Sequence, residues 1–354
     1  MARVWAAMSG GVDSSVAAAL LVEQGHEVTG VTMRLLPDES ACCGRDAARA
    51  ARQVCDRLGI EHLTLDFRDA FEAGVVDPYC EDYAHGRTPN PCIDCNDRVK
   101  FAELLRRAAL QDVDLLATGH YARVLADGSG GAWVGRGADV TRDQSYFLYR
   151  LRPEQLRRIT FPVGGMLKDE VRAYAHKAGL PCADAPESRE ACFVPDGDVA
   201  AFVAARASAG GAGAVPGPIE DAAGRVLGAH GGIAGFTVGQ RKGLGLGGGE
   251  PRYVVRIEAE RNAIVVGAEA DLDVTEVVAS DAVWNGAPPG GASALTARVR
   301  YRGAETPCTA AYDAADGRLT VTFAAPVRAV APGQAVVCYA GETVVGGGTV
   351  ASAR

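Results

Sequence analysis

The chain has 354 residues, of which 48% are hydrophobic and 23% charged, and its mean hydropathy is +0.02. This composition excludes a disordered or fibrous protein, and a chain longer than roughly 250–300 residues is expected to hold two or three domains. The net charge of −8 argues only weakly against a nucleic-acid partner, because binding patches are local. There is no apolar run of the ~18–20 residues that a membrane span needs and no signal-peptide pattern, so we expect a cytoplasmic protein without membrane contact.

The first 120 residues alternate short apolar runs with helical patterns. Strands are expected at Val4–Met8, Val28–Leu35, His62–Phe67 and Asp114–Thr118, and helices at Val12–Gln24, Arg45–Leu58 and Asn96–Ala109. This series predicts a doubly wound, Rossmann-like parallel sheet, which binds its ligands at the carboxyl ends of the strands. The loops at 8–15, 33–44 and 118–121 follow predicted strands and should line that edge.

The rest of the chain changes character twice. Residues 153–179 have helical patterns, and a last helix is expected at Val199–Ala207. A Gly/Pro/Ala stretch then reads as a linker, and the sequence beyond it consists of short strand patterns separated by turns. We therefore expect a catalytic α/β domain over 1–208 and a central β-rich domain over 216–278. A C-terminal β-barrel that contacts a nucleic-acid partner is expected over 279–354.

The sharpest local signal is the loop Ser9-Gly-Gly-Val-Asp-Ser-Ser15, between the first predicted strand and helix. Two glycines let the backbone approach a ligand, and amides and hydroxyls at a helix start bind anions, so the loop predicts a phosphate site. A capped glycine-rich turn is the alternative. The loop has no GxxxxGK[ST] pattern and no lysine, which disfavours a kinase or a motor protein. It resembles the PP-loop of N-type ATP pyrophosphatases, which implies cleavage of ATP to AMP and pyrophosphate.

Cysteines mark two further segments. Residues 86–101 read GRTPNPCIDCNDRVKF, a proline-stiffened loop that enters a helix, where the positive end of the helix dipole should favour the thiolates of Cys92 and Cys95. A lone CxxC fits half a zinc site, a redox pair, or a cluster or persulfide site; no second CxxC or CxxH is present, which lowers the zinc interpretation. Cys192, in the run CFVP, is by itself more typical of a half-buried structural thiol.

Taken together, the motifs resemble those of the bacterial tRNA-specific 2-thiouridylases, which place sulfur on C2 of the wobble uridine. The resemblance extends over nearly the whole chain, through the blocks SGGVDSS, GRTPNPC, ATGHYAR, RDQSYFLY, FPVG, CFV, FTVGQRKGLG, RYR and PGQ in family order. It implies an enzyme, a tRNA sulfurtransferase, with ATP and Mg²⁺ as its cofactors and tRNA as its substrate.

The resemblance also implies roles for single residues, with Asp13, Cys95 and Cys192 as the catalytic groups. The residues implied to contact ATP are Ala7, Met8, Ser9, Gly10, Gly11, Val12, Asp13, Ser14, Met33 and Gly119. The residues implied to contact tRNA are Asn90, Pro91, Cys92, His120, Arg142, Asp143, Gln144, Arg300, Tyr301 and Gln334. The aromatic side chains of the RDQSYFLY block are expected mainly to pack in the core.

In the scheme that the resemblance implies, the uracil C2 oxygen attacks the α-phosphorus of ATP and pyrophosphate leaves. A persulfide on Cys192 then supplies sulfur to C2, Cys95 releases it by forming a disulfide, and AMP departs. The sulfur would come from a persulfide donor charged by a cysteine desulfurase, or from free sulfide. Adenylation is chemically reasonable because it gives the uridine carbonyl a leaving group that a thiolate-type nucleophile can displace.

One position departs from the family pattern: the first residue of the CxxC is aspartate in the best-known members and Cys92 here. Cys92, Cys95 and Cys192 therefore also resemble the ligands of the cluster-binding tRNA thiolases, in which three cysteines hold a [4Fe-4S] cluster. The persulfide and the cluster both stay open as the sulfur carrier. Cys42 and Cys43 are expected to be ordinary thiols rather than accessory ones.

Two other functions fit part of the pattern. A PP-loop ligase or thiolase could act on a small molecule or on another RNA position, and its formation of AMP and pyrophosphate would then not depend on this tRNA substrate. An RNA-binding protein with an inactive nucleotide fold would bind tRNA and hydrolyse nothing. The intact PP-loop and the three thiols disfavour the second of these.

Overall fold

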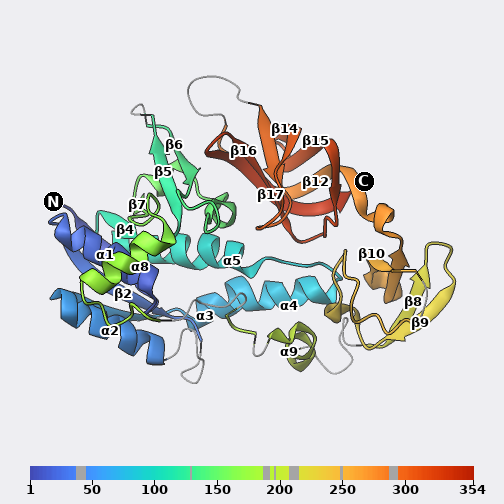
Figure 1. The fold of residues 1–354 in the computed structure, drawn as a ribbon, viewed down its shortest axis with the longest axis horizontal. Coiled ribbons are helices and arrows are strands. Elements are labelled where there is room, and N and C mark those ends of the chain that lie inside the picture. Colours follow the sequence, from blue (N-terminus) through green and yellow to red (C-terminus); the bar gives the residue numbers. More distant parts are fainter. Residues whose placement is uncertain are drawn as a thin grey trace.

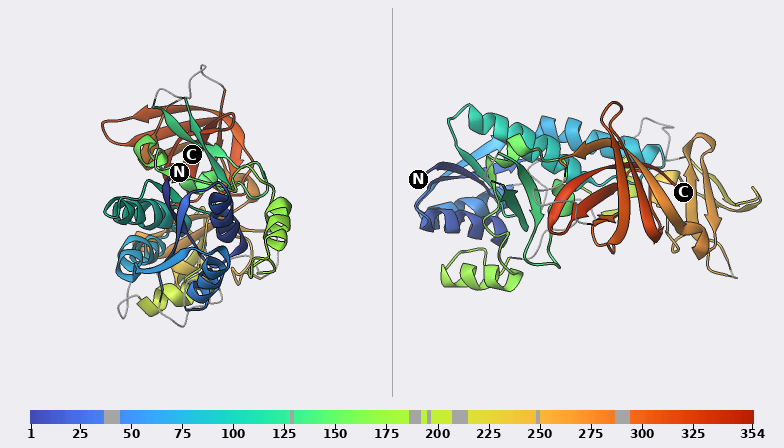
Figure 2. Two further views of the ribbon diagram at one scale, coloured as in Figure 1. Left: turned by 90° about the vertical axis from the view of Figure 1, so that its left-hand side faces the viewer. Right: turned by 90° about the horizontal axis from the view of Figure 1, so that it is seen from above.

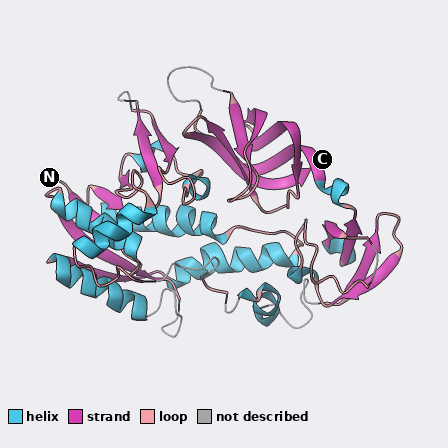
Figure 3. Cartoon of the chain, in the orientation of Figure 1, coloured by secondary structure: helices cyan, strands magenta, loops and turns pink. Residues whose placement is uncertain are grey.

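The protein is described here by a computed structural model that covers residues 1–36, 45–127, 130–185, 192–194, 197–206, 215–247, 250–286 and 294–354. The expected thiols Cys42 and Cys43 lie outside these residues. Figure 1 shows an elongated molecule in which a parallel sheet with its helices occupies the N-terminal end, while a small sheet and a barrel occupy the other. Figure 3 shows the same division by secondary structure, with most helices around the first sheet.

The first sheet has five parallel strands in the order β3-β2-β1-β4-β7, as the doubly wound pattern predicts. Its strands are β1 (Arg3–Ala7), β2 (Glu27–Arg34), β3 (Glu61–Asp66), β4 (Leu115–Ala117) and β7 (Ile159–Thr160). The fifth strand corrects the expectation of helix throughout 153–179. A strand of two residues has no periodicity to detect, and β7 exists because it pairs with β4 at Leu116 and Ala117.

Helices cover both faces of this sheet because β1 alternates its side chains between two cores. Val4 and Ala6 pack with α1 (Val12–Glu23), α2 (Arg45–Leu58) and α8 (Lys168–Lys177), whereas Trp5 packs on the opposite face. The opposite core is filled from the helical segments that follow β3 and precede β4. These segments are α3 (Arg68–Phe71), η1 (Glu72–Val76), α4 (Asp77–Ala84), α5 (Pro91–Asp94), η2 (Cys95–Glu103) and α6 (Leu104–Ala109).

The segments α3-η1-α4 and α5-η2-α6 each form one continuous helical run, with π-helical turns in η1 and η2. The second run begins at Pro91, five residues before the predicted start, because Asn90 caps it. Both runs reach from the parallel sheet toward the central domain, as Figures 1 and 2 show. The shorter elements β5 (Ala122–Ala126), β6 (Ala132–Arg136), η3 (Ser145–Leu148), α7 (Pro153–Leu156) and α9 (Val199–Arg206) complete this part.

The C-terminal half consists of β-structure in two units. The central domain is a sheet in the order β10-β11-β8-β9, made of β8 (Gly217–Asp221), β9 (Val226–His230), β10 (Tyr253–Glu258) and β11 (Ala263–Gly267). The last unit is a barrel in the order β12-β15-β14-β13-β16-β17, closed by pairing of β12 with β17. Its strands are β12 (Asp273–Trp284), β13 (Leu295–Arg298), β14 (Thr306–Asp313), β15 (Arg318–Arg328), β16 (Ala335–Ala340) and β17 (Thr343–Ala353).

A buried ion network joins the barrel to the first domain. The carboxylate of Asp143, whose side chain is 2% exposed, lies 3.3 Å from the Arg298 guanidinium and 3.5 Å from that of Arg136. Glu305 contacts the same two arginines at 2.6 and 2.8 Å. The Arg136 guanidinium also lies over the ring of Tyr339, at 3.8 Å from its centroid. These contacts fix how the β5–β6 hairpin sits on the barrel.

We predict that Asp143→Asn lowers the free energy of unfolding by about 3 kcal/mol, because two buried guanidinium groups then share one carboxylate fewer. Urea denaturation measures this change. Asp313→Asn, at an exposed position of β14, is the matched control and should cost less than about 0.5 kcal/mol. Equal stability of the two variants would contradict the role given to the network.

Candidate functional site

The PP-loop is shaped by close backbone contacts. Gly10 has φ +80°, and a Cβ there would stand 2.8 Å from the carbonyl oxygen of Ala47, so only glycine fits. Gly11 is the N-cap residue of α1, and its carbonyl accepts hydrogen bonds from the Ser15 hydroxyl at 2.8 Å and the Ser14 hydroxyl at 3.1 Å. Because Gly11 has no side chain to cap α1, the first amides of the helix stay available to an anion.

Not every residue expected to contact ATP offers its side chain to the loop. Met8 and Val12 are 2% and 4% exposed and pack in the core beneath it, so they would meet a nucleotide only through their backbone. The Met8 carbonyl is held by the Thr32 hydroxyl at 3.0 Å. Ala7 and Met33 are half-buried at the ends of β1 and β2. The side-chain groups in the loop are the hydroxyls of Ser9 and Ser14, 3.3 Å apart, and the carboxylate of Asp13.

Asp13 is held by two residues from distant parts of the chain. Its Oδ1 accepts a hydrogen bond from the Tyr121 hydroxyl at 2.7 Å and one from the Lys168 ammonium at 2.6 Å. Burial and the Asp13 carboxylate both raise the pKa of Tyr121, which therefore stays a donor. Sequence reasoning missed Lys168, because it lies 155 residues from Asp13 and outside every motif.

The same carboxylate suits Mg²⁺, the metal that the family resemblance implies. Magnesium is usually bound by one or two carboxylates together with substrate phosphates, rather than by an all-protein cage. Asp13, 33% exposed at the first turn of α1, supplies one such carboxylate beside the expected phosphate site. The donor set therefore fits an ion that arrives with a nucleotide.

The ATGHY block packs directly on the PP-loop. A Cβ on Gly119 would stand 2.5 Å from the Ser14 backbone nitrogen and 2.6 Å from the Asp13 carbonyl carbon. The next residue, His120, is 9% exposed between the rings of Phe101 and Phe161, and its Nδ1 lies 2.7 Å from the Thr118 hydroxyl. Burial, and then the charge of Lys100, hold the pKa of His120 well below its usual value. His120 is therefore neutral.

Gly119→Ala should displace the ATGHY block from α1, because the new methyl group collides with backbone atoms that cannot move aside. We expect ATP binding to weaken at least tenfold. Isothermal titration with ATP and Mg²⁺ measures this. Gly165→Ala is the control, since a Cβ there meets nothing within 4 Å, and it should bind as the parent chain does. An unchanged affinity in Gly119→Ala would show that this contact does not shape the site.

The loop before the CxxC is held where the three units meet. The Thr88 amide donates to the Pro332 carbonyl at 2.7 Å, and the Gln334 side-chain amide donates to the Thr88 carbonyl at 2.8 Å. The Thr88 hydroxyl also lies 3.2 Å from that of Thr237 in the central domain. Gln334, expected to contact tRNA, thus has an internal partner that positions the loop.

The helical run α5-η2, which carries Cys92 and Cys95 and is called the cysteine helix below, is fixed at its start and along one side. The Asn90 side chain accepts a hydrogen bond from the Cys92 amide at 3.2 Å, and Pro91 takes the first helical position. Asp94, between the two cysteines, pairs with Arg150 at 2.8 Å. Arg150 in turn donates to the Thr349 hydroxyl of β17 at 3.0 Å, which links the CxxC to the barrel.

The structure brings Cys95 and Cys192 together, although the thiolate expectation is wrong for Cys95. Cys95 is 8% exposed, and burial raises its pKa to about 11, against a smaller lowering by Lys100. Cys192 and Cys92 lie close enough for their charges to raise it further. The helix dipole does not prevail because Cys95 lies one turn inside the helix, within the core.

The segment that carries Cys192 is anchored by its neighbour. Phe193 is 7% exposed and packs edge-on against Phe71 and Tyr79, with ring centroids 5.6 and 5.0 Å away. Cys192 itself is half-buried and packs against the same core as Cys95.

The three thiols do not form a ligand set for a cluster. Among the described residues, no group of three or more His, Cys, Asp or Glu side chains is arranged to hold a metal ion. Cys92 and Cys192 are half-buried, whereas Cys95 is buried in the core. This arrangement gives no support to a [4Fe-4S] cluster, which needs three thiolates directed at one point, and we derive no step through one.

The rate of Cys95 alkylation should rise with pH up to about 11, because only the thiolate reacts and its pKa is raised by burial. Labelling with iodoacetamide, followed by mass spectrometry of the peptide, measures this profile. In urea the same peptide should titrate near the ordinary thiol value of about 8.5. A folded-state profile that coincides with the unfolded one would contradict the burial of Cys95.

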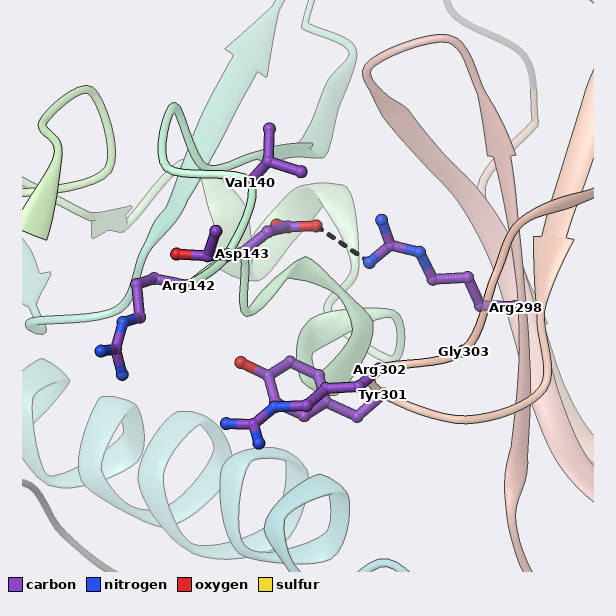
Figure 4. Close-up of a pocket in the computed structure, with 8 residues that line it drawn as sticks. Val140, Arg142, Asp143, Arg298, Tyr301, Arg302 and Gly303 are labelled. Atoms are coloured by element: carbon purple, nitrogen blue, oxygen red, sulfur yellow. Dashed lines mark hydrogen bonds and ion pairs between the residues drawn. The ribbon is translucent and has the colours of Figure 1, made fainter.

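An open cleft of about 490 Å³ lies between the loop after β6 and the turn between β13 and β14, as Figure 4 shows. Arg142 lines one side, and Arg298, Tyr301 and Arg302 line the other. Tyr301 packs against Phe147, with ring centroids 4.3 Å apart and ring planes tilted by 38°. The cleft joins basic groups to an aromatic face, which suits a nucleic-acid segment.

Two residues of the RDQSYFLY block that were expected to contact tRNA, Asp143 and Gln144, have partners inside the protein. Asp143 belongs to the ion network described above, and Gln144 exchanges hydrogen bonds with the Tyr121 backbone at 2.8 and 2.9 Å. Tyr146 and Tyr149 are fully buried, as expected for packing residues. Arg300 is exposed at the rim of the barrel turn.

Comparisons with known proteins agree with this architecture. Residues 2–196 match the model of the tRNA methyl transferase HUP domain, 210–268 the tRNA methyl transferase PRC-barrel domain, and 274–350 the aminomethyltransferase beta-barrel domain. The chain therefore combines an α/β HUP domain with two β-units. A solved structure described as NMN synthetase from Francisella tularensis is 19% identical, with a TM-score of 0.34 over 52% of this chain and 66% of that chain; so weak a likeness carries no argument.

Curated relatives define the family more closely. The protein named tRNA-specific 2-thiouridylase MnmA from Chloroflexus aurantiacus is 47% identical, with 99% of each chain covered. Proteins of the same name from Geobacter metallireducens and Moorella thermoacetica are 45% and 47% identical, over 99% and 98% of this chain and 97% and 98% of their own. The chain belongs to the tRNA-specific 2-thiouridylase family. In the part of the chain that the structure describes, no helix has the length and apolar character needed to cross a bilayer.

Proposed function

We propose that this protein catalyses the ATP-dependent 2-thiolation of the wobble uridine of tRNA, in the cytoplasm. The observation that supports the proposal is that Cys192 lies near enough to the buried Cys95 for its charge to raise the pKa of the Cys95 thiol. The chain is also similar to 2-thiouridylases over 99% of its length. A pair of thiols from distant segments is what sulfur transfer by disulfide exchange requires.

The first step is adenylation of the base. The uracil C2 oxygen attacks the α-phosphorus of ATP, the bond from that phosphorus to the β-phosphate oxygen breaks, and pyrophosphate leaves with the electron pair. The amides at the start of α1 and the hydroxyls of Ser9 and Ser14 bind the phosphate oxygens. Asp13 would hold Mg²⁺, which when bound would supply positive charge beside the leaving pyrophosphate.

The second step transfers sulfur. The outer sulfur of a Cys192 persulfide attacks C2, and AMP leaves with the former C2 oxygen. Cys95, as its thiolate, then attacks the Cys192 Sγ, forming a Cys95–Cys192 disulfide and releasing 2-thiouridine. Two electrons from a reductant restore the thiols. Because burial raises the pKa of Cys95, a base or a movement of the helix must assist its deprotonation.

The tRNA is proposed to bind between the first domain and the barrel. Its target base lies by Asn90, Pro91 and Cys92, and its backbone follows Arg142 and Arg300 along the cleft. Tyr301 offers an aromatic face to a flanking base. Asp143, Gln144 and Gln334 act by holding these surfaces in place, since their side chains are engaged within the protein.

The proposal is tested by mass spectrometry of nucleosides from unmodified tRNA incubated anaerobically with the protein, ATP, Mg²⁺ and a persulfide donor, a cysteine desulfurase with cysteine as its substrate. We expect 2-thiouridine to form equally with iron-free and with cluster-reconstituted protein. Cys192→Ser should lower its formation at least a thousandfold, and Asp13→Asn should abolish pyrophosphate release while tRNA still binds. Cys308→Ser, on β14 of the barrel, is the control for the cysteine variant.

Product formed only by the reconstituted protein would overturn the persulfide scheme in favour of a cluster. Pyrophosphate release that is independent of tRNA would instead support a ligase or thiolase for a small molecule. Binding of tRNA without any turnover of ATP would support an RNA-binding protein with an inactive nucleotide fold.

A further inference from the structure

We propose that Lys168 is a catalytic residue, whose ammonium binds the phosphates of ATP and stabilises the leaving pyrophosphate. This inference rests on the proposed function, and it names a group that the PP-loop itself lacks. The chain has four lysines, at positions 100, 168, 177 and 242, and none lies within the loop Ser9–Ser15. A polyphosphate bound only by neutral amides and hydroxyls would leave most of its charge uncompensated.

The position of Lys168 is costly for a residue with a merely structural role. The residue is 8% exposed, although lysine is rarely so buried. It also begins α8, where the positive end of the helix dipole disfavours a cation. The Asp139 carboxylate accepts a hydrogen bond from the Lys168 backbone amide at 3.0 Å, which holds this helix start against the loop after β6.

Two helix starts and this ammonium converge on one carboxylate. Asp13 lies in the first turn of α1, Lys168 in the first turn of α8, and the two helices lie side by side in Figures 1 and 2. The Lys168 ammonium also lies 5.7 Å from the ring centroid of Tyr121, whose hydroxyl meets the same Asp13 oxygen. The carboxylate that meets the Lys168 ammonium is that of Asp13, whereas Asp139, Asp169 and Glu170 lie around the start of α8. An anion that takes the place of Asp13 would therefore bind this ammonium at the edge of the PP-loop.

ATP with Mg²⁺ would supply that charge by an exchange of partners. When Asp13 turns to the metal ion, the Lys168 ammonium loses its carboxylate and donates its hydrogen bonds to phosphate oxygens instead. During adenylation it stabilises the negative charge that passes to pyrophosphate as the bond from the α-phosphorus breaks. The lysine keeps its proton throughout, so it acts through charge and not as an acid.

The test compares Lys168→Met, Lys168→Arg and Lys177→Met by equilibrium dialysis with two ligands, ATP with Mg²⁺ and adenosine. Loss of one charged hydrogen-bond donor should weaken ATP binding by about 10- to 100-fold and leave adenosine binding unchanged. Lys168→Arg should recover part of the affinity. Lys177→Met, exposed near the end of the same helix, should bind both ligands as the parent chain does.

A double variant separates contact with phosphate from an effect through Asp13. In an Asp13→Asn background there is no carboxylate for Lys168 to neutralise, so a further fall in ATP affinity on adding Lys168→Met supports direct contact. No further fall, or an equal fall for ATP and adenosine, would overturn the proposal. If the parent chain binds ATP in this way yet releases no pyrophosphate with tRNA, the proposed function fails while the role of Lys168 in ATP binding stands.

Discussion

The arrangement of the catalytic domain depends on one carboxylate, that of Asp13. Its Oδ1 receives the hydroxyl of Tyr121 and the ammonium of Lys168, from the loop after β4 and from the start of α8. Since Gly119 packs on the backbone of Asp13 and Ser14, the loop after β4 has no room to shift. Three segments that are far apart in sequence are thereby held at the carboxyl edge of the parallel sheet, where such folds bind their ligands.

Contacts from the central domain and the barrel also fix the position of the helical run that carries Cys92 and Cys95. Thr88 is held by the turn before β16 and by the central domain, and Arg150 connects Asp94 of the CxxC to β17. The loop after β6 is held at both ends: Asp139 caps α8 beside the PP-loop, and Asp143 pairs with Arg298 of the barrel. Displacement of the barrel would therefore be felt at both the nucleotide loop and the cysteine helix. A substrate that bound both the first domain and the barrel, as proposed for tRNA, would depend on this coupling.

Much of the fold follows from local sequence. The alternation of Val4 and Ala6 with Trp5 predicts a strand between two cores, and the helix at Arg45–Leu58 was predicted with its observed ends. β7 could not be predicted, because two residues contain no period and only their pairing with β4 makes them a strand. The β5–β6 hairpin was missed as well, although its residues follow the ATGHY block.

The parts of the site that depend on backbone shape could be predicted from the sequence. The parts that depend on charged side chains brought together by the fold could not. Gly10 and Gly119 are required by contacts that a motif records. Cys192 lies near enough to Cys95 to affect its pKa, and the catalytic role of the two thiols stays a prediction. Lys168 lies in an ordinary helical pattern, and nothing local distinguishes it from Lys177. The thiolate expectation for Cys95 failed because the cost of burial exceeds the effect of a helix dipole, and burial is a property of the whole fold. Asp143 illustrates the same limit, since its partner Arg298 lies 155 residues away in the barrel.

The most direct measurement of the central claim follows the oxygen that leaves C2 of the uridine. A tRNA carrying ¹⁸O at that position is incubated with the protein, ATP, Mg²⁺ and a sulfur source, and the nucleotide products are analysed by mass spectrometry. Attack of the C2 oxygen on the α-phosphorus predicts one ¹⁸O atom in AMP for each 2-thiouridine formed, and none in pyrophosphate. Unlabelled AMP, or ¹⁸O found in phosphate released with ADP, would contradict activation of the base by adenylation at the PP-loop.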